Sequence, residues 1–319
     1  MNNSNNSIKI MIAGASGMVG NAIKKRYLNA EKYNPQIYKI LSPSRNELNL
    51  LNFEEVKNWF EENCPDIVIL AAAKVGGIFA NKNNPADFIL HNLKIQTNLI
   101  EISNYFKVKK FLFLGSSCIY PRLATQPITE KDLLSGQLEI TNEPYAIAKI
   151  AGVKMCEAYN KQYKTKYLSL MPTNTYGPND NYDINNSHFF PALIKKAHEC
   201  KIKKQKIFKV WGSGKPLREL IFVDDIADAC LFFMKKKTKN VLINIGTGKE
   251  KSISDYAKFI VKKINIKVKI KFDKSKPDGV PRKVLDISLA KKYGWKPKVS
   301  LDEGFNITYK DFLKNKNRT

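Results

Sequence analysis

A tyrosine and a lysine four residues apart, in the stretch YAIAK, have side chains suited to proton transfer. Tyr145 and Lys149 would lie on one face of a helix, with the ammonium group near the phenol. A cation at that position lowers the pKa of a tyrosine, so Tyr145 could transfer a proton near neutral pH. Ser116 or Ser117, at the end of the preceding predicted strand, could complete a hydrogen-bonding triad around a carbonyl group. Together with a glycine-rich turn near the N-terminus, this set indicates hydride transfer to a carbonyl carbon.

A cysteine and a histidine are further candidates for moving protons. Cys118 comes just after an apolar run, in FLFLGSSCIYP, where a sheet would place it at the mouth of a ligand site. Ordinary thiols and imidazoles have pKa values of about 8.5 and about 6.5, which suit acid–base work at neutral pH. The residues alone leave alternatives open, because Cys118 could be a small core residue and His188 an ordinary surface or core histidine.

The first predicted strand is followed by the turn GASGMVG, which spaces Gly14, Gly17 and Gly20 three residues apart. Gly14 permits the tight turn, Gly17 lets a pyrophosphate approach backbone N–H groups, and Gly20 lets the next helix pack on the strand. This spacing is typical of the short-chain dehydrogenase/reductase superfamily. The turn predicts a dinucleotide site, and a purely structural turn is the alternative.

Arg45 follows the second predicted strand, where the adenosine ribose of a dinucleotide should lie. A guanidinium group there can pair with a 2′-phosphate, whereas an acidic residue would select the unphosphorylated ribose. Arg45 therefore favours NADPH over NADH, with an ordinary surface arginine as the alternative.

Apolar runs and helix-length segments alternate through the first half of the chain. Five strands are predicted at 9–14, 36–41, 66–73, 110–116 and 167–172, and four helices at 20–30, 53–63, 85–106 and 145–163. This alternation predicts an α/β fold of the Rossmann type, a doubly wound parallel sheet that binds ligands beyond the carboxyl ends of its strands. In the second half we expect strands at 218–224 and 241–246, a loop at 179–187, and helices at 191–200, 226–234, 254–264 and 288–293.

The composition limits the classes of function. The formal net charge of +25 comes from lysines scattered over the whole chain without any nucleic-acid-binding motif, so we expect no nucleic-acid partner. No apolar run reaches the roughly 20 residues of a membrane helix, and the polar start MNNSNNS predicts a frayed arm without a secretory signal. Five unclustered cysteines and three histidines favour a reducing cytoplasm and no metal site.

Eight segments of the chain, spread over roughly residues 8 to 312, resemble the GDP-L-fucose synthase family. They are AAAKVGGIFAN, NPADFILHN, LFLGSSCIYP, NEPYAIAKIAG, MPTNTYGPND, NSHFFPALI, VWGSGKPLRELIFVDD and KPDGVPRKVLD. The resemblance implies a Rossmann domain with a smaller C-terminal substrate domain, in a homodimer. On this basis we expect an NADP-binding domain of residues 1–177 with 217–246, and a GDP-sugar-binding domain of residues 178–216 with 247–319.

The resemblance also implies roles for individual residues. The catalytic serine, tyrosine and lysine fall on Ser116, Tyr145 and Lys149, and the epimerisation pair falls on Cys118 and His188. Cofactor contacts fall on Gly14, Ala15, Ser16, Gly17, Met18, Val19, Gly20, Arg45, Leu114, Gly115, Ser116, Ser117, Lys149, Pro172, Thr173, Asn174, Thr175 and His188. Substrate contacts fall on Lys196, Trp211, Arg218 and Asp278. Some relatives carry a basic residue in place of Ser16, so the NADPH preference depends mainly on Arg45.

The family's chemistry explains why a thiol would stand at the strand end. A 4-keto group acidifies the hydrogens on C3 and C5, and Tyr145 and Ser116 could stabilise the resulting enolate oxygen. Cys118 and His188 could then remove and return protons on opposite faces of the sugar. The resemblance thus implies a cytoplasmic NADP(H)-dependent enzyme that epimerises and reduces GDP-4-keto-6-deoxy-D-mannose to GDP-L-fucose. A reductase of another GDP-4-keto sugar, such as a heptose, and a non-catalytic NADP-binding regulator are the alternatives.

Overall fold

The computed structural model describes residues 7–33, 38–184, 186–276 and 278–315. Nearly all of the predicted N-terminal arm lies outside these residues. Within these ranges, no helix combines the length and the apolar character needed to cross a membrane. In the same part of the chain, no three His, Cys, Asp or Glu side chains gather closely enough to hold a metal ion.

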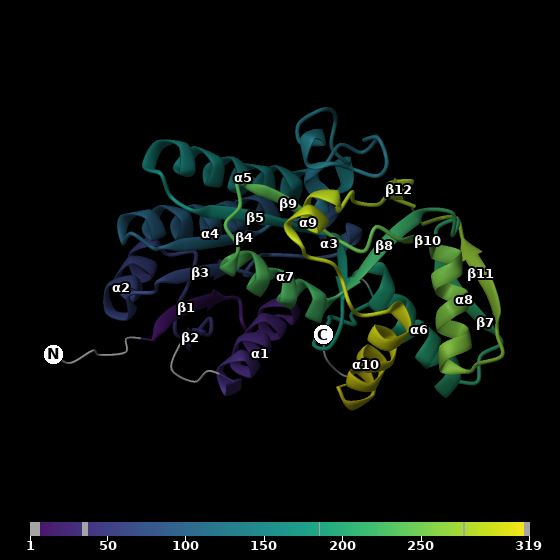
Figure 1. Cartoon of the computed structure of the whole chain (residues 1–319). Coiled ribbons are helices and arrows are strands. Elements are labelled where there is room, and N and C mark those ends of the chain that lie inside the picture. Colours follow the sequence, from purple (N-terminus) through teal and green to yellow (C-terminus); the bar gives the residue numbers. More distant parts are fainter. Residues whose placement is uncertain (1–6, 34–37, 185, 277, 316–319) are drawn as a thin grey trace.

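A six-stranded parallel sheet forms the centre of the larger part of the molecule (Figure 1). Its order is β2-β1-β3-β4-β5-β9, with the strands β1 (Ile8–Ala13), β2 (Tyr38–Leu41), β3 (Ile67–Leu70), β4 (Lys110–Leu114), β5 (Tyr167–Pro172) and β9 (Leu242–Ile245). Strand β3 (IVIL) is apolar throughout, and β9 (LINI) is apolar except for the buried Asn244, because helices cover both faces of the sheet. The predicted α/β, Rossmann-type sheet is confirmed.

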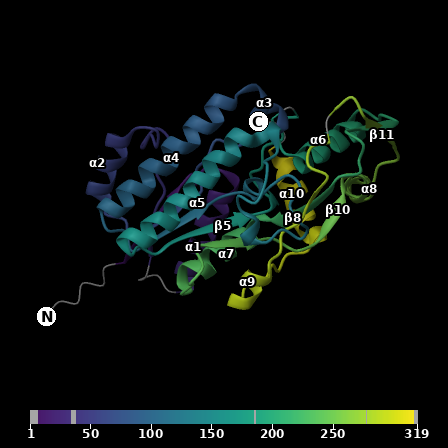
Figure 2. The same cartoon turned by 90° about the horizontal axis from the view of Figure 1, so that it is seen from above.

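The helices form one layer on each face of the sheet. One layer holds α2 (Phe53–Asn63), α4 (Pro85–Tyr105) and α5 (Glu143–Tyr163), and α4 and α5 lie side by side in Figures 1 and 2. The other layer holds α1 (Met18–Tyr33) and α7 (Val223–Lys235), which pack against each other. The layer of α2, α4 and α5 buries one hydrophobic core, and the layer of α1 and α7 shares a second core with other helices of the second half of the chain.

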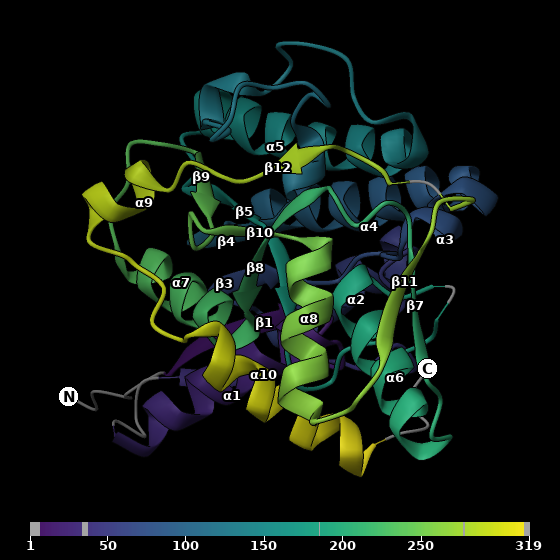
Figure 3. The ribbon, with the colours of Figure 1, turned by 90° about the vertical axis from the view of Figure 1, so that its right-hand side faces the viewer.

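The second half of the chain builds a smaller unit beside the carboxyl ends of this sheet (Figures 1 and 3). Strand β8 (Leu217–Phe222) pairs with β6 (Asn174–Tyr176), β10 (Glu250–Ser252) and β12 (Arg282–Lys283), and β7 (Ile207–Trp211) pairs with β11 (Lys269–Asp273). The helices here are α6 (Phe189–Ile202), α8 (Ile253–Ile264) and α10 (Leu301–Lys314), whereas α9 (Ser288–Tyr293) packs beside β9 of the central sheet. Short helical turns elsewhere are α3 (Ile78–Asn83), η1 (Ser117–Ile119), η2 (Glu130–Asp132) and η3 (Ile140–Asn142).

All predicted strands and helices occur, with ends that move by a few residues. The sequence did not predict α3, α10, or the strands β6, β7, β10, β11 and β12. Helix α10 contains Gly304 near its start, and a Cβ atom there would lie 2.3 Å from the Tyr176 hydroxyl. Gly304 lowers the helix propensity of this segment, but the close packing of α10 against Tyr176 leaves no room for a side chain. The proposed division into two domains stays a prediction.

Candidate active site

The glycine turn brings the start of helix α1 against the end of β1. Gly14 has a φ of +86°, and a Cβ atom on it would lie 2.6 Å from the Ala72 backbone nitrogen. A Cβ atom on Gly20 would lie 2.1 Å from the Gly14 oxygen, so the helix can approach the strand only without a side chain there. Ser16 and Gly17 are exposed, and the first turn of α1 holds no acidic residue. This cradle at a helix N-terminus fits the pyrophosphate of a dinucleotide.

Arg45 is exposed and follows the carboxyl end of β2, beside the strand that carries the glycine turn. In a Rossmann-type sheet this is the side on which the adenosine ribose lies. The position therefore fits a guanidinium group that pairs with a 2′-phosphate.

Ser116, Tyr145 and Lys149 come together at the carboxyl end of β4. Lys149 is only 3% exposed, and its Nζ donates to the Leu114 carbonyl oxygen at 2.9 Å. The same Nζ lies 4.7 Å from the centre of the Phe113 ring and 5.9 Å from that of the Tyr145 ring. Ser116 is close enough to the Tyr145 phenol for a hydrogen bond that favours the ionised phenol. The arrangement can hold a carbonyl oxygen and deliver a proton to it.

The electrostatics of this set differ from the sequence prediction. Burial raises the pKa of Tyr145, the nearby Cys118 raises it further, and Ser116 only partly opposes these effects. Burial also lowers the pKa of Lys149 to about 7. The prediction that Lys149 lowers the pKa of Tyr145 is therefore wrong for this geometry, because the ammonium group is itself desolvated and lies beside the ring. Tyr145 keeps its proton at neutral pH.

Cys118 lies in the same turn as Ser116 and faces polar groups. Its backbone N–H donates to Ser116 Oγ at 3.3 Å. The Asn142 side-chain amide donates to its Sγ at 3.1 Å, and Lys283 Nζ lies 3.7 Å from the same sulfur. Cys118 is half-buried. Cys118 is therefore a partly exposed residue with polar neighbours, and its part in the chemistry stays a prediction.

His188 precedes helix α6, and its side chain is not engaged in capping that helix. The imidazole is exposed, yet desolvation by surrounding protein lowers its pKa, and the Lys283 ammonium lowers it further. Lys283 thus lies near both His188 and Cys118. The Lys283 cation thus links the surroundings of the two predicted proton-transfer groups, because it contacts the Cys118 sulfur and acts on the His188 imidazole.

Arg218 and Lys283 stand opposite each other on the paired strands β8 and β12. The buried carboxylate of Glu219 holds this region, because it accepts from the backbone N–H groups of Gly248 at 2.7 Å and Leu285 at 2.8 Å. The Glu219 carbonyl oxygen accepts from the Asn174 side chain at 3.0 Å. The predicted cofactor segment from Pro172 to Thr175 is thereby joined to the strand that carries Arg218.

The remaining predicted substrate residues lie at the exposed Trp211 ring and against the turn that follows it. Lys196 Nζ lies 4.0 Å from the centre of this ring, and burial lowers the pKa of Lys196. Asp278 accepts at Oδ1 from the Ser213 N–H at 2.7 Å, and its carbonyl oxygen lies 3.4 Å from Arg218 Nη2. The side chains of Trp211 and Arg218 offer a ring face and a fork of donors, which suit a nucleotide diphosphate.

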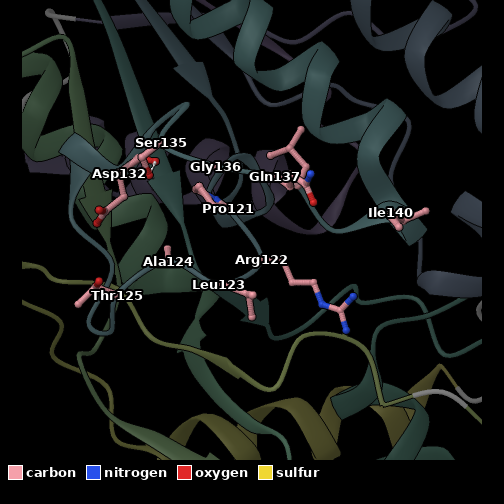
Figure 4. Close-up of a pocket in the computed structure, with 11 residues that line it drawn as sticks. Pro121, Arg122, Leu123, Ala124, Thr125, Asp132, Ser135, Gly136, Gln137 and Ile140 are labelled. Carbon is pink, nitrogen blue, oxygen red and sulfur yellow. Dashed lines mark hydrogen bonds between the residues drawn. The ribbon is translucent and has the colours of Figure 1, made fainter.

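A separate pocket of about 650 Å³ lies in the loop after Cys118 (Figure 4). It is lined by residues 121–125 and 135–138, together with Asp132 and Ile140. None of the predicted catalytic residues lines this pocket. We therefore place the catalytic centre at the carboxyl end of β4 and the first turn of α5.

Two polar residues of the site were not singled out from the sequence, although both lie in segments that carry the family resemblance. Asn142 begins NEPYAIAK, three residues before Tyr145, and Lys283 lies in KPDGVPRKVLD. Their sequence positions give no sign of the sulfur that they contact. Lys283 is 165 residues from Cys118 in sequence, and its segment reaches the sulfur by pairing with β8 and by bonding at Val284 to Ile128 in the loop after Cys118.

Comparison with known proteins agrees with this geometry. Residues 10–246 match the NAD dependent epimerase/dehydratase family. A GDP-L-fucose synthase of Sinorhizobium fredii is 48% identical over 307 residues, which cover 96% of each chain. The structure of a GDP-L-fucose synthetase from Naegleria fowleri bound to NADP has a TM-score of 0.89 and 28% identity, covering 100% of this chain and 96% of that one. A GDP-6-OMe-4-keto-L-xylo-heptose reductase from C. jejuni has a TM-score of 0.88 and 33% identity, covering 98% of this chain and 99% of that one. The chain belongs to the NAD dependent epimerase/dehydratase family.

Proposed function

We propose that this protein is an NADPH-dependent enzyme that epimerises C3 and C5 of GDP-4-keto-6-deoxy-D-mannose and then reduces C4 to give GDP-L-fucose. The observation that carries the proposal is the turn that holds Ser116 and Cys118 together, beside Tyr145 and within reach of Lys283. The residues proposed for reduction and the thiol proposed for proton transfer are therefore close enough to act on the same sugar. The high identity with a GDP-L-fucose synthase over nearly the whole chain supports the same reaction.

The epimerisation follows from the acidity of carbons next to a ketone. The Cys118 thiolate removes a proton from C3 or C5, and the electron pair moves to the C4 oxygen. Tyr145 and Ser116 donate to that oxygen and stabilise the enolate. Inversion requires a proton from the opposite face, and His188 is the group that can deliver it. Either group can act as base or acid at the two carbons.

The reduction uses the same hydrogen bonds from Tyr145 and Ser116 to the C4 oxygen. NADPH, when bound, supplies the hydride that adds to C4. Tyr145 is protonated at neutral pH and gives its proton to the C4 oxygen as the hydride arrives. Gly14 to Gly20 and Arg45 would hold the pyrophosphate and the 2′-phosphate of the cofactor. Arg218 and Trp211 would hold the diphosphate and the nucleotide of the sugar substrate.

Product analysis in D₂O tests this proposal. Wild-type enzyme with GDP-4-keto-6-deoxy-D-mannose and NADPH should give GDP-L-fucose carrying deuterium at C3 and C5, seen by NMR and mass spectrometry. Cys118→Ala should lose this exchange, while slow reduction of the unepimerised ketone remains possible. Cys64→Ser is the matched control, because Cys64 is exposed and precedes β3, at the opposite end of the sheet. Wild-type exchange in Cys118→Ala would contradict the role of the thiol.

A second candidate is the C4 reduction of another GDP-4-keto sugar, with or without epimerisation. The similarity to the C. jejuni heptose reductase over the full chain favours it. Parallel assays with the 4-keto heptose and the 4-keto-6-deoxy-hexose decide between the two, because the true substrate should show the higher kcat/KM. NADPH oxidation with either sugar would exclude a non-catalytic regulator.

We also propose that the enzyme works as a homodimer in the cytoplasm. Exposed apolar side chains on the two neighbouring helices α4 and α5, Leu90 and Ile147 among them, support an interface between two copies. All five cysteines are free, which suits a reducing compartment. Light scattering of the purified protein tests the oligomeric state.

A further inference from the structure

Asn142 occupies the N-cap position of helix α5 but does not cap it. Asparagine is favoured at this position because its side-chain oxygen accepts from a backbone N–H of the first turn. Ser252 and Ser300 make such bonds at the starts of α8 and α10. Asn142 makes none, and its Oδ1 is buried without a hydrogen-bond partner in the described part of the chain. Helix formation therefore does not explain this side chain.

The Asn142 side chain turns toward the proton-transfer thiol instead. Its Nδ2 donates to Cys118 Sγ at 3.1 Å, within normal range for a bond to sulfur. Lys283 Nζ, at 3.7 Å, is the other donor facing this sulfur. Two nitrogen donors, one amide and one ammonium group, therefore contact one sulfur.

Hydrogen bonds and an ion pair that involve residues 122 and 139 fix the turn that carries Asn142. The Asn142 backbone N–H donates to the Glu139 carbonyl oxygen at 3.1 Å. The buried Glu139 carboxylate lies 3.3 Å from Arg122 Nε across the loop, and it accepts from the Thr141 N–H at 3.4 Å. These contacts fix the backbone from which the amide reaches the sulfur, so the Asn142–Cys118 bond is built in before any substrate arrives.

We propose that Asn142 is a catalytic residue that donates its amide N–H to the Cys118 sulfur and stabilises the thiolate during proton abstraction. In that step a C–H bond of the sugar breaks, an S–H bond forms, and the electron pair passes to the carbonyl oxygen. Asn142 holds the sulfur before the step and releases it as the thiol forms. The role in turnover rests on the proposed function, whereas the effect on the sulfur does not.

Alkylation of Cys118 measures this effect without any substrate. Iodoacetamide reacts with the thiolate, so the rate at fixed pH follows the thiolate population. The work uses a Cys64→Ser background, because Cys64 is exposed, Cys118 is half-buried, and the remaining three cysteines are buried. Peptide mass spectrometry identifies the modified residue. The variants are Asn142→Ala and Asn142→Asp in that background.

Loss of the donor should slow alkylation of Cys118 by about 3-fold or more in Asn142→Ala. A hydrogen bond to a charged group shifts an equilibrium by about 10-fold, and the greater nucleophilicity of a less stabilised thiolate offsets part of this. Asn142→Asp should be slower still, because a carboxylate repels the thiolate. The smaller alanine side chain opens access to the sulfur, so a purely steric effect would raise the rate instead.

Thermal stability separates this role from a structural one. Asn142→Ala should keep its melting temperature within about 1 °C of the background, because the Asn142 side chain makes no cap hydrogen bond to helix α5. Ser300→Ala is the matched control, since Ser300 does cap α10, and its loss should lower the melting temperature by about 2 °C or more. Unchanged alkylation in both Asn142 variants would overturn the proposal. So would slower alkylation accompanied by a loss of stability as large as that of Ser300→Ala.

Deuterium exchange at C3 and C5, measured without NADPH, extends the test to turnover. Exchange should slow by about 10-fold in Asn142→Ala, with little change in NADPH affinity. Wild-type exchange in a variant whose alkylation is slowed would overturn the catalytic role. If wild-type enzyme exchanges neither carbon, the proposed function fails, and the alkylation result still decides whether Asn142 stabilises the thiolate.

Discussion

Replacing the buried Lys149 with methionine should stabilise the folded protein while it abolishes turnover. Lys149 is almost fully buried, and its ammonium group donates a hydrogen bond to the Leu114 carbonyl oxygen. Burial lowers its pKa from 10.5 to about 7. A protonated lysine in this place therefore destabilises the fold, and methionine fills a similar volume without a charge.

The size of the effect follows from proton linkage. Between about pH 7 and pH 10.5 the unfolded chain holds more protons on this lysine than the folded chain, so stability rises with pH across that window. The destabilisation from Lys149 is about 4 kcal/mol at pH 7 and about 2 kcal/mol at pH 9. Methionine removes it at both values but leaves the Leu114 carbonyl group unpaired, which costs about 1–3 kcal/mol. Lys149→Met should thus gain about 1–3 kcal/mol at pH 7, and about 2 kcal/mol less at pH 9.

Urea unfolding of the cofactor-free protein at pH 7 and pH 9 measures both free energies. The difference between the two pH values is the sharper quantity, because the unpaired carbonyl group contributes equally to both. Lys154→Met is the matched control, since Lys154 lies on the same helix but is exposed and pairs with Glu157 at 2.8 Å. Its stability change should be the same at the two pH values. A Lys149→Met gain that is equal at pH 7 and pH 9, or that grows with pH, would refute the linkage.

Three further substitutions test the assigned roles. Tyr145→Phe should lower the rate of reduction by roughly 10²–10⁴-fold with little change in NADPH affinity, and near wild-type turnover would remove Tyr145 from the mechanism. Arg45→Ala should raise KM for NADPH much more than for NADH, because only NADPH carries the 2′-phosphate; equal effects would make Arg45 a bystander. Arg218→Ala should weaken GDP-sugar binding by about 1.5–3 kcal/mol in calorimetry and leave NADPH affinity unchanged, and unaltered GDP binding would contradict its assignment.

The central sheet could be predicted from the sequence because each of its strands is a short apolar run between helix-length segments. Apart from the edge strand β2, these runs are largely buried, so their apolar composition is a local signal of a parallel sheet. The strands β7 (IFKVW) and β11 (KIKFD) were missed, although β11 alternates charged and apolar residues and β7 is rich in strand formers. Each is stable only through the other, and their partnership joins segments about 60 residues apart. A five-residue pattern is weak evidence for a strand when the partner strand lies so far away in the sequence.

The site was predictable in its residue types but not in its electrostatics. Tyr145 and Lys149 share a helix face as their spacing predicts, yet the pKa of Tyr145 moves upward. Spacing indicates that a cation is near but not whether it is hydrated, and the desolvated Lys149 cannot act as a full charge. Asn142 and Lys283 reach Cys118 from different parts of the chain, so their role depends on packing that no local motif encodes.

The raised pKa of Tyr145 gives one phenol two uses in the proposed reaction. During epimerisation the C4 oxygen carries the enolate charge, and a phenol that stays protonated can donate to it repeatedly without losing its proton. The proton is then still on Tyr145 when the hydride reaches C4, where it is finally transferred. A tyrosine with a lowered pKa would be ionised for part of the time and would repel the enolate. Burial of the Tyr145–Lys149 pair therefore suits an enzyme that must enolise a ketone before reducing it, and the thiol in the adjoining turn supplies the base that the tyrosine does not.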